Sequence, residues 1–573
     1  MSKRWMPPVI LAVLTCLLIE QFAAAVARPL AQSAAEGVLL SPAHGAVFAA
    51  GEPIVIEVEL AQDAAIEQVA LYANGDLITT LLEAPWRYLW QNAPSGIYTL
   101  EARGVTDSGA ASVLGSAQVL VQRAQLPNEP VPPSPVIIGV SWAPTSTITR
   151  IGVDSDNWTP TWADDGHLYS GYGDGKGFAP KLPEKVSMGF GRISGAPPHV
   201  VGTNVRSADE QPYGGGANGK KNSGLLMVDN VLYMWVRNVV YKGKGCQLAW
   251  STDHAQSWQW SDWVFPDFGY CTFINFGQNY AGARDDYVYM VTPDGPSAYV
   301  AYQDFVLTRV PKTQIANRDA YEFLRAVDAN NTPIWTSEIA QRGAVFSTVG
   351  EKAGRSGMVY NAALGRYLWW QGINAPGADE RYEGGFGVYD APEPWGPWTV
   401  VTYTELWDHP PGAVGTFPTQ WMSDDGRTLY LAFDANDGLS IRKVTLEIFD
   451  PRLPNDEASA PVTPTATPAD PTSTYTPTAL STAPPTWTPS APTPTTAGVF
   501  TPTATATLPP PTGTPFATNT PTPTAISANP ILTPAATFEP DVVPVATETS
   551  TPEPPIIRTE RRLYLPIARR AKP

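Results

Sequence analysis

Four aspartates fall within one stretch of twenty residues, and two of them are placed where they could do acid chemistry. Asp164 and Asp165 precede Gly166, a pattern typical of a three-residue hairpin loop. Asp156 and Asp174 lie at the two ends of the stretch. Pairing outward from that loop places Asp156 directly opposite Asp174, with Cβ atoms about 4.5–5.5 Å apart. Because opposed like charges destabilise a sheet, we expect a bound cation, a neighbouring Lys or Arg, or a shared proton to compensate them.

Two carboxylates held this closely are what glycoside hydrolysis needs. One carboxyl group protonates the leaving oxygen, and the other acts as nucleophile or base. Mutual repulsion separates their pKa values and so assigns the two roles. A separation near 5 Å favours retention of configuration, and a wider one favours inversion. A register slip of one residue would place the two side chains on opposite faces of the strand pair.

The same strand–turn–strand unit recurs four times downstream. The copies are residues 227–234, 283–290, 359–368 and 422–430. Five hairpins at this spacing predict a five-bladed β-propeller over residues 136–452. The first strand of each blade would line a central channel, so that residues at one end of these strands converge.

Alignment of the hairpins suggests which other side chains lie with the aspartates at the open end of the central channel. Lys221 takes the place of Asp156 in the second blade, and Gln278 and Arg355 fall close to it in the third and fourth. With Asn157 and Trp158, these residues are the predicted substrate-binding set. Trp158 could stack on a sugar ring or pack between blades. The five histidines show no metal-ligand spacing and no nucleotide-binding loop is present, so we expect neither a metal nor a cofactor.

The rest of the chain reads as an exported, modular, all-β protein. A basic start, an apolar run and a small-residue cleavage site predict a signal peptide at 1–27, with no membrane insertion after its removal. A Pro-rich linker follows at 124–135. A disordered Thr/Pro-rich stalk at 453–557 leads to a basic tail at 558–573 that could attach the chain to the cell envelope.

Residues 37–123 predict a small β-sandwich. Residues 54–60 alternate with a period of two, and Asn74-Gly75 is a hairpin signal. The order of these motifs, including residues 84–90, resembles bacterial immunoglobulin-like modules of secreted enzymes. That resemblance implies a spacer or an adhesion module.

Charge and cysteine content limit the possible partners. The formal net charge of −17, with no basic stripe, argues against nucleic acid. After export only Cys246 and Cys271 remain, and they could form a disulfide or stay as two buried thiols.

The propeller region resembles the domain of unknown function 4185 family. The matching segments are 156–158, 161–166, 172–175, 232–238, 309–311, 321–323, 360–361, 364–367 and 394–398. Some members of that family hydrolyse D-arabinan of bacterial envelopes, and their catalytic aspartates match Asp156 and Asp174. The resemblance implies a secreted or surface-bound glycoside hydrolase that cleaves a polysaccharide, such as an arabinan-type furanoside.

A non-catalytic carbohydrate-binding or adhesive propeller, displayed at the cell surface, is the alternative. If the aspartate pair fails, Glu383, Glu322 and Asp304 are the next carboxylates to consider as acid.

Overall fold

The computed structural model describes residues 37–240, 243–374 and 382–450. The predicted signal peptide, stalk and basic tail lie outside these residues. The described part is built from strands joined by turns and three-residue 3-10 helices. Within it, no helix is long and apolar enough to cross a membrane. The predicted all-β class is confirmed.

The first described segment folds as a sandwich of two sheets. One sheet holds β1 (Gly37–Ser41), β3 (Ile54–Leu60) and β6 (Arg87–Trp90). The other has the order β2 (Val47–Phe48), β8 (Ala111–Val121), β7 (Gly96–Val105), β4 (Gln68–Ala73) and β5 (Asp76–Leu81). The alternation in β3 sends Ile54, Ile56 and Val58 into the core at no more than 4% exposure. Asn74 and Gly75 turn between β4 and β5 with positive φ, as the Asn-Gly signal predicts.

Five blades follow, each with short strands in antiparallel order. The first holds β11 (Thr161–Trp162), β12 (Leu168–Gly175), β13 (Val186–Ser194) and β14 (Val201–Val205), with β15 (Gln211–Pro212) beside β13. The second holds β16 (Lys221–Val228), β17 (Val231–Val240), β18 (Lys244–Ser251) and β19 (Gln259–Phe265). The third holds β20 (Thr272–Asn275), β21 (Tyr287–Pro293), β22 (Asp304–Pro311), β23 (Glu322–Val327) and β24 (Pro333–Thr336), with β25 (Phe346–Ser347) beside β22.

The fourth blade holds β26 (Ser356–Asn361), β27 (Arg366–Asn374), β28 (Gly384–Ala391) and β29 (Thr399–Thr404). Its inner strand β26 also pairs in parallel with β20 of the third blade. The fifth blade holds β30 (Gly415–Thr416), β31 (Thr428–Phe433) and β32 (Leu439–Ile448). Each predicted hairpin joins the first and second strands of one blade, so the predicted five-bladed propeller is confirmed.

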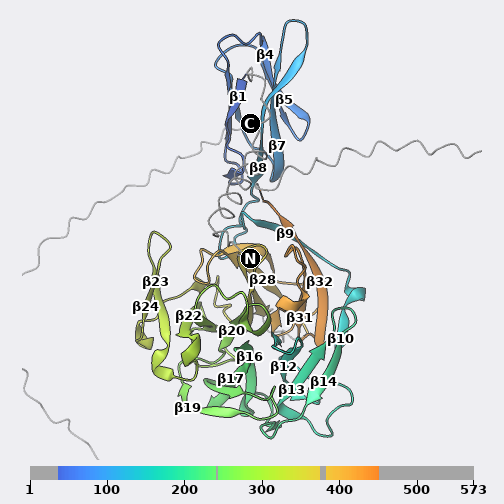
Figure 1. The fold of residues 1–573 in the computed structure, drawn as a ribbon, viewed down its shortest axis with the longest axis vertical. Helices are drawn as coiled ribbons and strands as arrows, with labels where there is room; N and C mark the ends of the chain where they lie inside the picture. Colours follow the sequence, from blue (N-terminus) through green and yellow to red (C-terminus); the bar gives the residue numbers. More distant parts are fainter. Residues whose placement is uncertain (1–36, 241–242, 375–381, 451–573) are drawn as a thin grey trace, which may run out of the picture. The chain divides into compact units, whose positions relative to one another are not determined.

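The ring is closed by strands from its two ends in sequence. β9 (Ile137–Trp142) and β10 (Thr149–Ile151) both pair with the free edge of β32 (Figure 1). Arg442 of β32 strengthens this closure, because its Nε donates to the backbone oxygen of Ala143 at 2.7 Å. Its two Nη atoms bond the carboxylate of Asp408 in the connection between the fourth and fifth blades. A closed ring leaves no unpaired strand edge at this seam.

The two remaining cysteines form a disulfide. Cys246 lies in β18 and Cys271 lies directly before β20, and both are fully buried. The bond therefore ties the second blade to the first strand of the third, and it settles the alternative that the sequence left open.

Removal of this cross-link should destabilise the ring. We expect Cys246→Ala together with Cys271→Ala to lower the free energy of unfolding by about 3 kcal/mol, because the 25-residue separation would no longer be constrained in the unfolded chain. Denaturant unfolding of the two proteins measures the difference, and wild-type protein treated with a reductant is the control. An unchanged midpoint in the double variant would contradict the prediction.

Candidate functional site

The hairpin of the first blade forms as predicted near its loop. Thr161 pairs with Tyr169 and Trp162 with Leu168, and the Ala163 nitrogen donates to the His167 oxygen at 2.9 Å. The loop of three residues is therefore correct.

At the other end of the hairpin the predicted register is wrong by one residue. Asp156 pairs with Gly173 rather than with Asp174, through two backbone hydrogen bonds of 3.0 and 2.7 Å. The segment between Asp156 and Thr161 thus holds one residue more than the strand opposite. Pro160 has no N–H for the ladder, and Asn157 has a φ of 60°. These two residues interrupt regular pairing, as in a β-bulge.

The slip does not separate the two carboxylates, because the backbone of Asp174 is also irregular. Asp174 has a φ of 40°, outside the conformation of a regular strand. Its carboxylate forms an ion pair with the ammonium group of Lys221. Its Oδ2 also accepts a hydrogen bond of 3.3 Å from the Gly216 nitrogen.

Gly173 lets Asp156 and Lys221 come together above it. A β-carbon at Gly173 would lie 2.6 Å from the Asp156 Oδ1 and 3.5 Å from the Lys221 Cδ. The Asp156 carboxylate therefore occupies the space that a side chain at position 173 would fill, and the Lys221 side chain lies beside that space at ordinary contact distance. The structure thus brings together Asp156, Asp174 and Lys221, and the lysine supplies the charge compensation expected from the sequence.

The two carboxylates sit in unlike surroundings. The Asp156 Oδ1 is buried and has no hydrogen-bond partner among the described residues. Burial raises the pKa of Asp156, Lys221 lowers it, and the charge of Asp174 raises it further, with a net rise. Burial also lowers the pKa of Lys221, although Asp174 and Asp156 oppose that effect. The Asp174 side chain remains 22% exposed.

Every blade contributes a polar side chain to this cluster. The first two blades contribute the aspartates and Lys221, whose Cα partner in the ladder is Arg237 of β17. Arg237 is 1% exposed, and its Nη1 donates to the Tyr299 hydroxyl, from the β21–β22 connection, at 2.8 Å. Arg355, directly before β26, lies 5.3 Å from the Tyr299 ring. Asp434, directly after β31, completes the set.

Asp434 is a buried carboxylate that the sequence reasoning missed. Its Oδ2 accepts from the Asn157 nitrogen and its Oδ1 from the Val414 nitrogen, both at 2.9 Å. Burial and the charge of Asp156 raise the pKa of Asp434 to about 7, against the effect of the two backbone donors. It therefore fixes the backbone beside Asp156 and couples the fifth blade to the first.

Two predicted substrate-binding residues are buried. Trp158 has no exposed surface, and its ring packs 4.8 Å from Phe178 and 5.0 Å from Tyr172. It belongs to the core between the first and fifth blades, so stacking on a sugar is the wrong alternative. Asn157 is also fully buried, and its amide bonds Asn222 and Arg237. It positions the site and is not open to a ligand.

The prediction for Gln278 is wrong. Its Nε2 donates to the Asp164 oxygen at 3.0 Å, in the hairpin loop of the first blade. That loop and Asp174 lie at opposite ends of β12, which at about 3.3 Å per residue puts them roughly 20 Å apart. Hairpin alignment failed here because residues 278–280 form a 3-10 turn instead of a strand.

The three carboxylates that the sequence offered as alternative acids bond other side chains or lie exposed. Glu322 forms an ion pair with Arg309 at 2.7 Å in the outer part of the third blade. Asp304 accepts from the Ser347 hydroxyl at 2.6 Å. Glu383 is exposed directly before β28.

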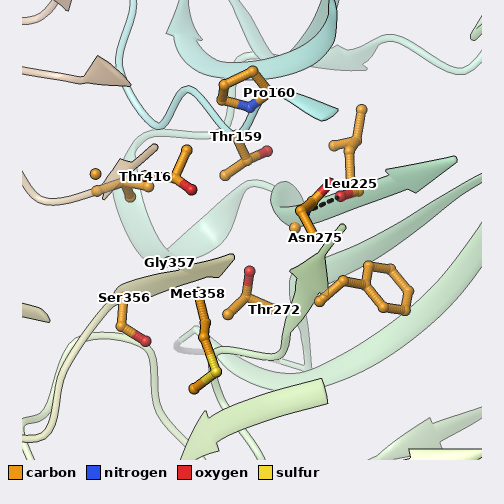
Figure 2. Close-up of a pocket in the computed structure, with 13 residues that line it drawn as sticks. Thr159, Pro160, Leu225, Thr272, Asn275, Ser356, Gly357, Met358 and Thr416 are labelled. Atoms are coloured by element: carbon orange, nitrogen blue, oxygen red, sulfur yellow. Dashed lines mark hydrogen bonds between the residues drawn. The ribbon is translucent and has the colours of Figure 1, made fainter. Parts of the chain in front are cut away.

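The axis of the ring is filled. A cavity of about 20 Å³ lies there, lined by inner-strand residues of all five blades, and Thr159, Thr272, Gly357 and Thr416 face it (Figure 2). Such a volume holds about one water molecule. At one side of the cavity, the Asn275 side chain donates to the Leu225 oxygen at 3.2 Å (Figure 2). The channel is therefore too small for a sugar at this point.

One group of possible metal ligands lies elsewhere. Donor atoms of Asp164, Asp165 and His254 fall within 4.8 Å of one another at the hairpin loop. They are engaged with protein partners, since His254 bonds Asp164 at 2.8 Å and Asp165 accepts from the Tyr169 hydroxyl at 2.9 Å.

Comparisons with known proteins bear on both domains. Residues 37–102 match the family model described as a bacterial Ig domain. No curated protein matches the chain in sequence. A fibronectin(III)-like module structure of Clostridium thermocellum CbhA shares 28% identity, covers 16% of this chain and 99% of its own, and has a TM-score of 0.15.

Two solved hydrolase structures are similar over about half of the chain. A GH43_1 enzyme from Xanthomonas citri shares 12% identity, with 54% of this chain and 92% of its own covered, at a TM-score of 0.31. A GH62 hydrolase in complex with xylotriose shares 8% identity, with 52% and 92% covered, at a TM-score of 0.30. Likenesses of this size assign no activity to this chain.

The pKa of Asp434 predicts a pH dependence of stability. In the unfolded chain the carboxyl ionises near pH 4, and in the folded chain at about 7. The folded state therefore holds more protons in this window, so stability should fall as the pH rises from about 4 to 7. Asp434→Asn should remove this contribution and cost about 1–3 kcal/mol, because its amide nitrogen cannot accept a backbone hydrogen bond. Unfolding measured across this pH range tests both effects, and an equal slope in the variant would contradict them.

Proposed function

We propose that the chain is a secreted or surface-bound glycoside hydrolase that cleaves a polysaccharide at Asp156 and Asp174. The observation that carries the proposal is the placement of two carboxylates in unlike surroundings around one buried lysine, with Asp156 and Lys221 packed over Gly173. Glycoside hydrolysis requires one protonated and one ionised carboxyl group at the same bond.

The surroundings suggest which carboxyl group does what. Burial raises the pKa of Asp156, so this group holds a proton that it can give to the leaving glycosidic oxygen. Asp174 pairs with Lys221 and is partly exposed, where its carboxylate can attack the anomeric carbon or take a proton from water. Arg237 and Arg355 lower the pKa of Asp156 and so favour release of that proton.

The polysaccharide that we propose is an arabinan-type furanoside. The resemblance of residues 136–452 to the domain of unknown function 4185 family supports this choice, because some members act on D-arabinan. The predicted signal peptide and Thr/Pro-rich stalk support export, and the basic tail supports attachment to the cell envelope.

A carbohydrate-binding propeller without catalysis is the second candidate. The observation in its favour is that Asp174 already has two partners, Lys221 and the Gly216 nitrogen, which would suit a purely structural ion pair.

Neutralising either aspartate should separate the two candidates. We expect Asp156→Asn and Asp174→Asn in the full chain each to lower kcat on arabinan by about 10²–10⁴-fold, because each removes a proton-transfer or nucleophilic group. New reducing ends released from arabinan, arabinogalactan and xylan are the readout. Asp229→Asn is the matched control, because this exposed turn residue has a φ of 48° that Asn tolerates. Glycan binding without cleavage by the wild type would favour the binding propeller.

Lys221 should set the pH range of the reaction. Its charge lowers the pKa of Asp156, so Lys221→Met should raise that pKa further. The proton donor then stays protonated to higher pH, and the alkaline limb of kcat/KM moves upward while the maximum rate falls. The neighbouring Lys220→Met is the control, since Lys220 lies over the Trp260 ring instead. An alkaline limb that stays in place would contradict the assignment of Asp156 as the acid.

A further inference from the structure

Tyr299 is the most exposed side chain of the cluster, and no role has been assigned to it above. It lies between β21 and β22 and is 42% exposed. Its hydroxyl oxygen accepts from the Arg237 Nη1 at 2.8 Å and from the Asn238 Nδ2 at 3.0 Å. The ring also lies 5.2 Å from the Arg237 guanidinium and 5.3 Å from that of Arg355. Two arginines and one asparagine amide therefore hold this exposed phenol in a defined position.

The hydrogen bonds that the Tyr299 hydroxyl group makes within the protein do not use its proton. A tyrosine hydroxyl has one O–H to donate and lone pairs that accept. In both of its hydrogen bonds the Tyr299 hydroxyl oxygen is the acceptor. Among the described residues, no acceptor takes the hydroxyl proton. Since the two donors occupy the acceptor side, the O–H bond must point away from Arg237 and Asn238 and can reach a ligand.

The groups that hold Tyr299 also hold the aspartates. Arg237 donates its Nη2 to the Asn157 side chain at 3.2 Å, directly beside Asp156. The Asn238 amide donates to the Gly216 oxygen at 3.3 Å, and the Gly216 nitrogen donates to Asp174 at the same distance. The phenol and the two carboxylates are therefore fixed by the same few buried groups, so that a ligand at the aspartates meets Tyr299.

We propose that Tyr299 is a substrate-contacting residue of this site, which donates its hydroxyl proton in a hydrogen bond to a hydroxyl or ring oxygen of the bound sugar. The inference rests on the proposed site at Asp156 and Asp174. The bond forms without proton transfer, so the reaction still balances through the two carboxyl groups. The acceptor of this hydrogen bond would be a neutral oxygen of the sugar. The bond would help the site to distinguish sugars by their hydroxyl groups, which the buried Trp158 cannot do.

The charges around the phenol predict when this contact is lost. Burial raises the pKa of Tyr299, but Arg237, Arg355 and the Asn238 hydrogen bond lower it, and the net shift is downward from 10. As the pH rises through this lowered pKa, the donor proton leaves and the hydrogen bond to the sugar is lost. Affinity for the sugar should therefore fall as the pH rises through the ionisation of Tyr299, and Tyr299→Phe should remove that fall.

Two measurements on the full chain test the inference. In an Asp174→Asn background, which prevents turnover, Tyr299→Phe should weaken binding of arabinan oligosaccharides by about tenfold, as expected for the loss of one good hydrogen bond. In the active chain it should lower kcat/KM, and the affinity of the Tyr299→Phe protein should no longer fall at alkaline pH. Absorbance titration of the ligand-free proteins should show one tyrosine fewer ionising below pH 10 in Tyr299→Phe. Tyr213→Phe is the control for binding and for kcat/KM, as an exposed tyrosine without these contacts, and should match the wild type in both.

Each outcome decides something different. Unchanged affinity and an unchanged pH profile in Tyr299→Phe, with cleavage intact, would overturn this inference and leave the proposed function standing. Arabinan binding that depends on Tyr299 without any cleavage by the wild type would support the contact and overturn the hydrolase. Failure of arabinan, arabinogalactan and xylan to bind or be cleaved would overturn both.

Discussion

The ion pair between Lys221 and Asp174 is the interaction on which the candidate site depends. Lys221 is 2% exposed, and an ammonium group buried without a partner would be very costly. Asp174 and, more weakly, Asp156 supply the opposite charge. A β-carbon at position 173 would lie 2.6 Å from the Asp156 Oδ1, so the glycine there lets the Asp156 carboxylate approach this pair. Charge compensation, the missing side chain and the irregular backbone of Asp174 are therefore parts of one arrangement.

The ring delivers these groups to one place. Each blade starts near the axis, so its first strand and the connections around it end close to the corresponding parts of the other blades. The cluster draws Lys221 from the second blade, Tyr299 from the third, Arg355 from the fourth and Asp434 from the fifth. Closure through β9, β10 and β32 keeps the fifth blade beside the first. Because these two blades are adjacent, the Asp434 carboxylate can accept a hydrogen bond from the Asn157 backbone nitrogen. Ring closure thus supports the chemistry as well as the stability of the fold.

Much of the fold could be predicted from the sequence because its signals are local. Turn residues such as Asn74-Gly75, and the repeated hairpins, depend on backbone conformations that a few residues determine. The same reasoning placed Asp156, Asp174 and Lys221 near each other. It failed for the register at Asp156, although Pro160 was a visible warning that a regular ladder could not run through that segment. It left two alternatives open for Trp158, stacking on a sugar or packing between blades, because the contacts between two blades are not visible in one strand.

The sequence by itself determined the all-β class, the number of blades and the pair of aspartates at the ends of one hairpin, since these follow from turn chemistry and repetition. Only the tertiary structure decided which side chains surround that pair. Arg237, Tyr299 and Asp434 come from segments roughly 80 to 280 residues away from Asp156, and no local pattern marks them. Their meeting depends on how five sheets pack around a common axis, and so does the burial that makes the two carboxyl groups differ.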